Sequence, residues 1–97
     1  MNADRQCSLL IIDDDIADIV LYKELLESTC DPGMYQFEIA NTGKQGLKMF
    51  RTLNPDCVLL DYNLPDTTGL DLLKKLSEIS SILPVVMLTG QGNEAIA

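Results

Sequence analysis

The sequence predicts an α/β protein with a doubly wound parallel β-sheet that carries helices on both faces. Three observations support this fold class: short continuous apolar runs recur along the chain, helical patterns separate them, and the connections are short. Continuous apolar runs are typical of parallel strands that are covered on both faces. Right-handed crossovers place the intervening helices over the sheet. The 97 residues contain no internal repeat and no Ser/Gly-rich linker, so we expect a single domain over residues 1–97.

The first half of the chain predicts two strand–helix units. Residues 8–12 form a continuous apolar strand, and the helix that follows extends from residue 16 to about residue 30. Its expected apolar face combines residues Ile16, Ile19, Val20, Leu25 and Leu26. Alternating apolar and polar residues predict a second strand over 35–40. A capping box at Thr42 and Gln45 predicts a helix that buries Leu47, Phe50 and Leu53.

The second half repeats this pattern. A third strand is expected over 57–62, and the loop after it contains the turn-forming residues Pro65, Asp66 and Gly69. The next helix is expected to bury Leu70, Leu73, Leu76 and Ile79. Residues 84–89 predict a fourth strand, and residues 94–97 the start of another helix. The order is therefore β-α-β-α-β-α-β, followed by a helix start.

The composition excludes several classes of function. Fifteen acids oppose seven bases, so the net charge of −8 argues against nucleic-acid or membrane binding through net charge. The absence of histidine excludes Ser–His and Cys–His nucleophile pairs and His-ligated zinc. Cys7, Cys30 and Cys57 form no C-x-x-C pair and are expected to be reduced packing residues of a cytoplasmic protein. The apolar runs are far shorter than the roughly 20 residues that span a bilayer.

Acidic residues follow two of the predicted strands. Asp13, Asp14 and Asp15 come directly after the first strand, and Asp61 lies late in the third. Taken alone, the triplet is equally compatible with carboxylates at a helix N-terminus, with Asp15 as the N-cap. If strands one and three are neighbours, however, Asp13, Asp14 and Asp61 converge at one edge of the sheet. Such a cluster favours a hard divalent cation, and magnesium needs only one or two carboxylates plus waters.

Two further observations concern the same edge. Thr89 ends the fourth strand and could donate its hydroxyl to a bound anion, although threonine is common in strands and is weak evidence alone. Aspartates occupy the turn after strand one, where a glycine-rich phosphate loop would otherwise be expected. A phosphate that binds here is therefore expected to arrive together with a metal ion.

Three segments of the sequence form a specific combined pattern. They are LLIIDDD over residues 9–15, PDCVLLDYNLPDTTG over residues 55–69 and LPVVMLTG over residues 83–90. In these segments the chain resembles the receiver domain of response regulators from two-component signal transduction systems, over essentially its whole length. The resemblance implies the flavodoxin-like receiver fold, with strand order 2-1-3-4 in this chain.

The resemblance also implies roles for five residues. Asp61 matches the phosphoacceptor, and Asp13 and Asp14 match the acidic pair that holds Mg²⁺, with Asp14 as the more direct ligand. Asn63 matches the position whose backbone carbonyl completes the metal site. Thr89 matches the switch hydroxyl that moves toward the phosphoryl group.

These roles imply a signalling module and not a conventional enzyme. The phosphoryl group is expected to come from a histidine kinase or a phosphotransfer protein, and the chain would contribute at most to catalysis of its own phosphorylation and dephosphorylation. Phosphorylation of Asp61 would then switch an output surface. The histidine that this chemistry requires would belong to the partner, because this chain has none.

The sequence also departs from the family pattern, which continues with a full fourth helix, a fifth strand and a fifth helix. This chain contains at most the start of helix four and lacks the lysine that follows strand five, so we expect an incomplete receiver domain. Without that cation, phosphorylation is expected to be slower or less stable. An uncovered fourth strand is expected to favour self-association through the edge of the sheet.

Two other functions compete with a phosphoacceptor. One is a haloacid dehalogenase-type phosphohydrolase, which also uses an aspartate nucleophile with magnesium. That family requires a second acid two residues after the nucleophile, where this chain has Asn63. The other is a receiver-like interaction or oligomerisation module that is never phosphorylated.

Overall fold

The computed structural model of the 97-residue chain describes residues 6–29, 33–82 and 84–88. Its strands are β1 (Cys7–Ile12), β2 (Tyr35–Ala40), β3 (Cys57–Asp61) and β4 (Val85–Leu88). Its helices are α1 (Ile16–Thr29), α2 (Gly43–Leu53) and α3 (Gly69–Ile79). The strands form one parallel sheet in the order β2-β1-β3-β4, which confirms the predicted fold class and strand order.

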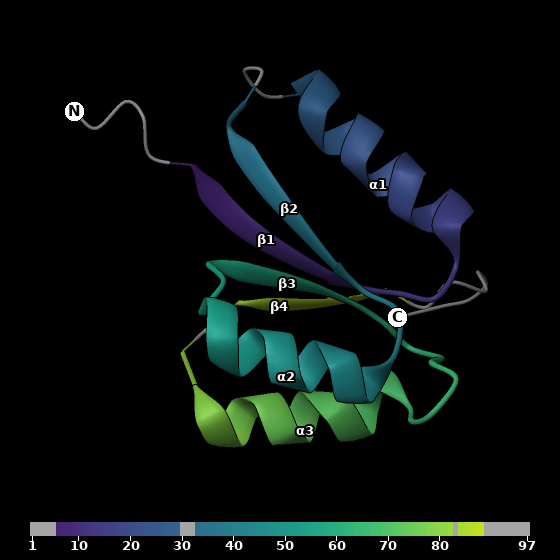
Figure 1. The fold of residues 1–97 in the computed structure, drawn as a ribbon, viewed down its shortest axis with the longest axis vertical. Helices are drawn as coiled ribbons and strands as arrows, with labels where there is room; N and C mark the ends of the chain where they lie inside the picture. Colours follow the sequence, from purple (N-terminus) through teal and green to yellow (C-terminus); the bar gives the residue numbers. More distant parts are fainter. Residues whose placement is uncertain (1–5, 30–32, 83, 89–97) are drawn as a thin grey trace.

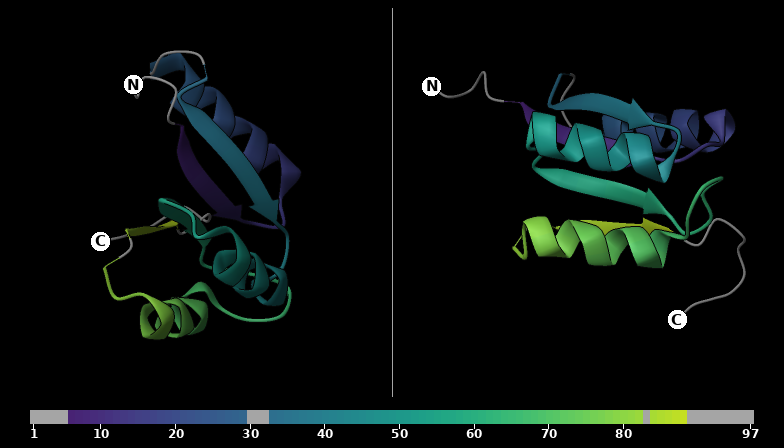
Figure 2. Two further views of the ribbon diagram at one scale, coloured as in Figure 1. Left: turned by 60° about the vertical axis from the view of Figure 1, so that its left-hand side comes forward. Right: turned by 60° about the horizontal axis from the view of Figure 1, so that its bottom comes forward.

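The helices are divided between the two faces of the sheet. Helix α1 covers one face, whereas α2 and α3 lie side by side on the other (Figures 1 and 2). The central pair is β1 and β3, in which Ile12 lies opposite Leu60. Because the chain winds outward in both directions from this pair, the order of the strands reverses between them. The carboxyl ends of β1 and β3 therefore meet at the topological switch point, where sheets of this class bind ligands.

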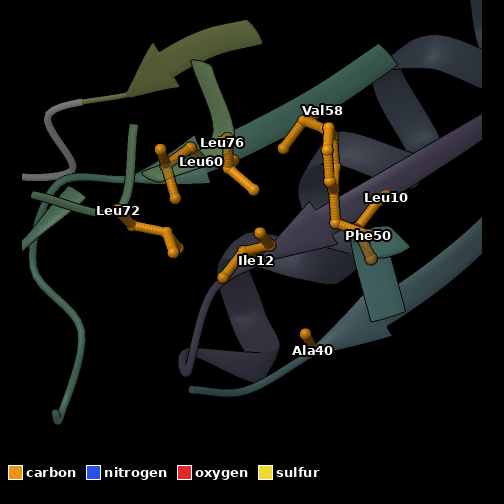
Figure 3. Close-up of a cluster of buried hydrophobic side chains, with 8 residues drawn as sticks. All are labelled: Leu10, Ile12, Ala40, Phe50, Val58, Leu60, Leu72 and Leu76. Atoms are coloured by element: carbon orange, nitrogen blue, oxygen red, sulfur yellow. The ribbon is translucent and has the colours of Figure 1, made fainter. Parts of the chain in front are cut away.

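The larger hydrophobic core lies between the sheet and helices α2 and α3 (Figure 3). It consists of Leu10, Ile12, Ala40, Phe50, Val58, Leu60, Leu72 and Leu76. A smaller cluster on the other face joins Leu9 and Ile11 to Ile19 of α1. Since β1 contributes alternate side chains to both clusters, the strand is buried on both faces, as its continuous apolar run predicted.

The predicted apolar face of α1 was wrong for most of its residues. Ile19 is buried, but Ile16, Val20 and Leu25 are 72%, 47% and 56% exposed. The apolar residues of this helix are distributed around its whole circumference, so their spacing does not define a single buried face. The residues that pack toward the sheet are Ile19, Tyr22 and Leu26.

The predictions for α2 and α3 were correct at some positions and wrong at others. Phe50 and Leu76 are buried as expected, whereas Leu53, Leu70 and Ile79 are exposed. In α3 the buried positions are Gly69, Leu72 and Leu76. Gly69 sets this face, because its backbone lies directly against the end of β3. The residues one and two turns later on the same side of the helix are then Leu72 and Leu76.

The ends of the elements agree closely with the predictions. The Thr42 hydroxyl accepts a hydrogen bond from the Gln45 N–H at 3.0 Å, which confirms the predicted N-cap of α2. Strand β3 ends at Asp61, one residue before the predicted end. Cys30, Thr89 and the predicted helix start over 94–97 lie outside the described residues. None of the described helices is long and apolar enough to cross a membrane.

Candidate metal centre at the carboxyl edge of the sheet

Three carboxylates meet where β1 and β3 end. One oxygen from each of Asp13, Asp14 and Asp61 lies within 4.8 Å of the other two. Strand pairing explains this arrangement, because Ile12 and Leu60 are register partners and the aspartates follow them in the chain. The convergence of Asp13, Asp14 and Asp61 that the sequence predicted is therefore present in the structure.

The Asp13 side chain is the most buried of the three, with 1% of its surface exposed. Its Oδ1 accepts a hydrogen bond from the Asp15 N–H at 2.9 Å. Its Oδ2 is also buried but has no hydrogen-bond partner among the described residues. A buried carboxylate oxygen in this condition carries a large desolvation penalty unless another group compensates it.

The electrostatics of the cluster disfavour three free carboxylates. Burial, helped by the charges of Asp61, Asp18 and Asp14, raises the pKa of Asp13 to about 6 against the opposing effect of the Asp15 N–H. Burial also raises the pKa of Asp61, with a smaller contribution from Asp14, although the backbone N–H of Asn63 opposes the shift. In both cases the protein stabilises the uncharged form relative to water. A bound cation would reverse this preference.

The donor set at this edge fits a hard divalent cation. The available ligands are carboxylate oxygens, which Mg²⁺ and Ca²⁺ prefer, and no described residue adds a thiolate or an imidazole to the cluster. Asp14 is exposed while Asp13 and Asp61 are largely buried, so a cation here would be reached from solvent on the Asp14 side. The buried Oδ2 of Asp13, which has no hydrogen-bond partner in the part of the chain that the structure describes, is available as an oxygen donor at the buried side.

The loop after β3 is folded tightly against the start of α3. The Leu64 N–H donates to the Thr67 carbonyl at 3.1 Å, and Asn63 and Thr68 form an isolated antiparallel bridge. A Cβ at Gly69 would lie 2.5 Å from the Asp61 carbonyl oxygen, so only glycine fits at this position. The structure thus places Asn63 in a short, structured loop two residues beyond Asp61.

Strand β4 reaches the same edge of the sheet. Leu88, its last residue, is the register partner of Asp61, and its carbonyl accepts from the Tyr62 N–H at 2.9 Å. Thr89, the next residue in the chain, lies outside the described residues, so its predicted position beside Asp61 stays a prediction.

Two residues near the cluster were missed in the sequence. Asp18 raises the pKa values of both Asp13 and Asp61 and therefore belongs to the same electrostatic site. Burial, followed by the charges of Asp18 and the other aspartates, raises the pKa of Tyr22 to about 12. Asp18 and Tyr22 are four residues apart, and residues at this spacing on a helix share one face. Their spacing in the sequence therefore indicated that they lie together. Asp18 lies in the first turn of α1, directly after the aspartate triplet.

Curated proteins of similar sequence include several regulators. The regulatory protein LuxO of Vibrio cholerae is 31% identical over 83 residues, which are 86% of this chain and 17% of that protein. The alkaline phosphatase synthesis transcriptional regulatory protein PhoP of Bacillus subtilis is 30% identical over 86 residues, or 89% of this chain and 34% of that protein. The aerobic respiration control sensor protein ArcB of Escherichia coli is 33% identical over 85 residues, with 84% of this chain and 10% of that protein covered.

This chain therefore spans only a minor part of the length of each of these relatives. It spans about two thirds of the length of the solved receiver domains that follow. A CheY-like receiver domain protein from Methanospirillum hungatei superposes with a TM-score of 0.78 at 31% identity, covering 92% of this chain and 68% of that one. The non-phosphorylated HemR receiver domain from Leptospira biflexa gives a TM-score of 0.75 at 30% identity, with the same coverage. The model of the response regulator receiver domain family matches residues 9–97. With the fold, the strand order and the acidic cluster in agreement, the chain belongs to the response regulator receiver domain family.

Proposed function

We propose that this chain is the phosphoacceptor module of a two-component phosphorelay, in which Asp61 receives a phosphoryl group in the presence of Mg²⁺. One observation carries the proposal: carboxylate oxygens of Asp13, Asp14 and Asp61 lie within 4.8 Å of one another, and the buried Asp13 Oδ2 has no hydrogen-bond partner among the described residues. The family match supports it, because receiver domains are signalling modules and not conventional enzymes.

The reaction transfers a phosphoryl group from a phosphohistidine to Asp61. A carboxylate oxygen of Asp61 attacks the phosphorus of a phosphohistidine in line, the P–N bond breaks, and its electron pair leaves with the imidazole nitrogen. Asp13 and Asp14 would hold the cation beside the acceptor. When bound, Mg²⁺ supplies positive charge that compensates the carboxylates and the phosphoryl oxygens. Water later hydrolyses the mixed anhydride on Asp61 and restores the carboxylate.

Asn63 and Thr89 complete the proposed site. Asn63 would contribute its backbone carbonyl to the cation from the loop after β3, and the bridge between Asn63 and Thr68 restricts that loop. Thr89 contributes a hydroxyl that hydrogen-bonds the phosphoryl oxygens and thereby shifts the segment after β4. The family pattern supports the role of Thr89, which lies outside the described residues.

The phosphodonor is a histidine kinase or a phosphotransfer protein. This chain contains no histidine, so a phosphohistidine must come from a partner. Among the similar proteins, ArcB is itself named a sensor protein and PhoP a transcriptional regulatory protein, and both contain a segment that resembles this chain. We propose a cytoplasmic location, where such partners and Mg²⁺ are available.

The competing functions fit the site less well. A phosphohydrolase of the haloacid dehalogenase type needs an acid at the position of Asn63, and the chain belongs to the receiver family instead. A module that is never phosphorylated would not need a buried carboxylate of which one oxygen has no hydrogen-bond partner among the described residues, since that oxygen costs stability.

Labelling with a radioactive small phosphodonor, such as acetyl phosphate, tests the proposal. We expect Mg²⁺-dependent incorporation of one acid-stable, base-labile phosphoryl group into the wild-type chain. The Asp61→Asn variant is expected to lose this label, because its amide cannot act as the nucleophile. Asp71→Asn serves as the matched control, since Asp71 is an exposed aspartate on α3 that lies outside the cluster.

Label that persists in the Asp61→Asn variant would contradict the assignment of the acceptor. Beryllofluoride separates a phosphorylated switch from a bare interaction module, because it mimics a phosphoryl group on a carboxylate. Binding that requires both Mg²⁺ and Asp61 supports the switch. A chain that binds neither Mg²⁺ nor beryllofluoride at this edge would be an interaction module.

A further inference from the structure

A carboxylate in the loop after β3 joins that loop to a different helix. Asp66 Oδ1 accepts a hydrogen bond from the Gly43 N–H at 2.7 Å, and Oδ2 accepts from the Lys44 N–H at 2.9 Å. Gly43 and Lys44 are the first two residues of α2, so one side chain binds the start of a helix that precedes it by more than 20 residues. The carboxylate is placed at the positive end of the helix dipole.

All four N–H groups at the start of α2 have an acceptor. Thr42 supplies the local N-cap, because its hydroxyl accepts from the Gln45 N–H at 3.0 Å and its carbonyl from the Gly46 N–H at 2.9 Å. Asp66 accepts from the remaining two, at Gly43 and Lys44. The helix is thus capped both from its own segment and from the loop after β3.

The fit at this contact is close. A Cβ at Gly43 would collide with the Cγ2 methyl of Thr67 and lie 3.3 Å from Asp66 Oδ1, so glycine is what allows the loop to approach. The Gly43 and Lys44 N–H groups lower the pKa of Asp66, because both hydrogen bonds stabilise the charged carboxylate. These observations describe a specific anchor for the loop and not a chance surface contact.

Both of the segments that Asp66 joins lead into the acidic cluster. On one side, the loop begins directly after Asp61 and includes Asn63. On the other side, the Asn41 side chain, two residues before Gly43, donates to the Asp13 carbonyl at 3.3 Å. The Asp13 N–H in turn donates to the Ala40 carbonyl at 2.9 Å. Asp66 therefore closes a ring of contacts that runs from Asp61 through α2 to Asp13.

We infer that Asp66 is a positioning residue for the cation site, which fixes the loop after β3 so that Asp61 and the Asn63 backbone face Asp13 and Asp14. This inference rests on the proposed function, since it presupposes that Mg²⁺ binds at the cluster. The sequence pattern identifies Asp66 only as a turn-forming residue. Its carboxylate holds a loop that supplies proposed ligands, and such supporting contacts commonly determine metal affinity.

The test compares two variants that remove caps from the same helix end. Asp66→Ala removes the two hydrogen bonds from the loop, whereas Thr42→Ala removes the local cap and leaves the loop contact intact. Mg²⁺ affinity is measured by calorimetric titration of each 97-residue chain at neutral pH. We expect Asp66→Ala to weaken Mg²⁺ binding by about tenfold, in the range found for supporting contacts at metal sites. Thr42→Ala is expected to lower the melting temperature but to leave the affinity for Mg²⁺ unchanged.

Hydrogen exchange of the Mg²⁺-free chain gives a second, independent measurement. The Leu64 N–H, which donates to the Thr67 carbonyl inside the loop, is expected to exchange faster in Asp66→Ala than in Thr42→Ala. If Asp66→Ala does not fold, Asp66→Asn replaces it, because its amide oxygen still accepts one of the two hydrogen bonds. That variant is expected to have an intermediate Mg²⁺ affinity.

The possible outcomes separate this inference from the proposed function. If the wild-type chain does not bind Mg²⁺, the proposed function fails. If the wild-type chain binds Mg²⁺ and both Asp66 variants bind it equally well, Asp66 is only a helix cap and the inference is overturned. Equal losses of affinity in Asp66→Ala and Thr42→Ala would also overturn it, because the stability of α2 would then account for the effect.

Discussion

At the scale of single residues, Asp13 contributes a destabilising term to the dependence of stability on pH. Its pKa is raised from 3.8 to about 6, chiefly by burial. Between these two pH values the Asp13 side chain still carries a proton in the folded chain but has already lost it in the unfolded chain. The resulting destabilisation is absent below pH 3.8 and fully present above pH 6. We predict that, without Mg²⁺ and above pH 6, Asp13→Asn raises the free energy of unfolding by about 1–3 kcal/mol.

Urea denaturation with and without Mg²⁺ measures this effect. The advantage of the Asp13→Asn variant is expected to be largest at pH 8 and to shrink as the pH falls toward 5. Saturating Mg²⁺ at pH 8 is expected to stabilise the wild-type chain and to have little effect on the variant, because a cation binds the folded site only. An Asp13→Asn variant that is less stable than the wild-type chain at pH 8 without Mg²⁺ would show that the carboxylate has another partner.

At the scale of elements, the close contact between α3 and β3 is the most restrictive. A Cβ at Gly69 would lie 2.5 Å from the Asp61 carbonyl oxygen and 2.9 Å from the Tyr62 Cα, and neither backbone atom can move aside cheaply. We predict that Gly69→Ala lowers the free energy of unfolding by about 1–3 kcal/mol, as overpacking does. In an exposed helix the same change would be stabilising by about 1 kcal/mol.

The matched control is Ser77→Ala, at an exposed position of the same helix. Its free energy of unfolding is expected to stay within about 0.5 kcal/mol of the wild-type value. Urea denaturation measures the stability of both variants, and labelling with acetyl phosphate reports the effect on Asp61. The Gly69→Ala variant is expected to be labelled more slowly, because α3 must move away from the acceptor. A Gly69→Ala chain as stable as the wild type would mean that the loop can relax.

The elements also show what the sequence could and could not predict. The parallel sheet was predictable, because continuous apolar runs and short connections restrict the chain to few topologies. The strand order that brings Asp13, Asp14 and Asp61 together followed from the resemblance to receiver domains and not from the apolar pattern. The buried face of α1 was not predictable, because the helix carries apolar side chains around its whole circumference. The contact of Asp66 with α2 was also inaccessible, since it depends on how two loops approach each other in space.

At the scale of the whole molecule, the described sheet leaves apolar surface beside β4. This strand lies at one edge of the described sheet and pairs with β3, while Val86 in its middle is 46% exposed. Val86 is the register partner of Leu59 and therefore lies on the face that α1 covers only in part (Figure 1). A strand edge next to an apolar face favours pairing with a second chain.

We predict that the chain self-associates reversibly through β4, so that its average mass in sedimentation velocity rises with protein concentration. Val86→Lys is expected to shift the equilibrium toward the monomer, because a lysine on an edge strand opposes pairing. Leu70→Lys is the matched control, since Leu70 is 47% exposed but lies on α3, on the other face of the sheet. Association is expected to strengthen with added salt, because the net charge of −8 makes two copies repel each other and salt screens that repulsion. A monomer at every salt and protein concentration, or an equal effect of the two variants, would show that β4 is not the interface.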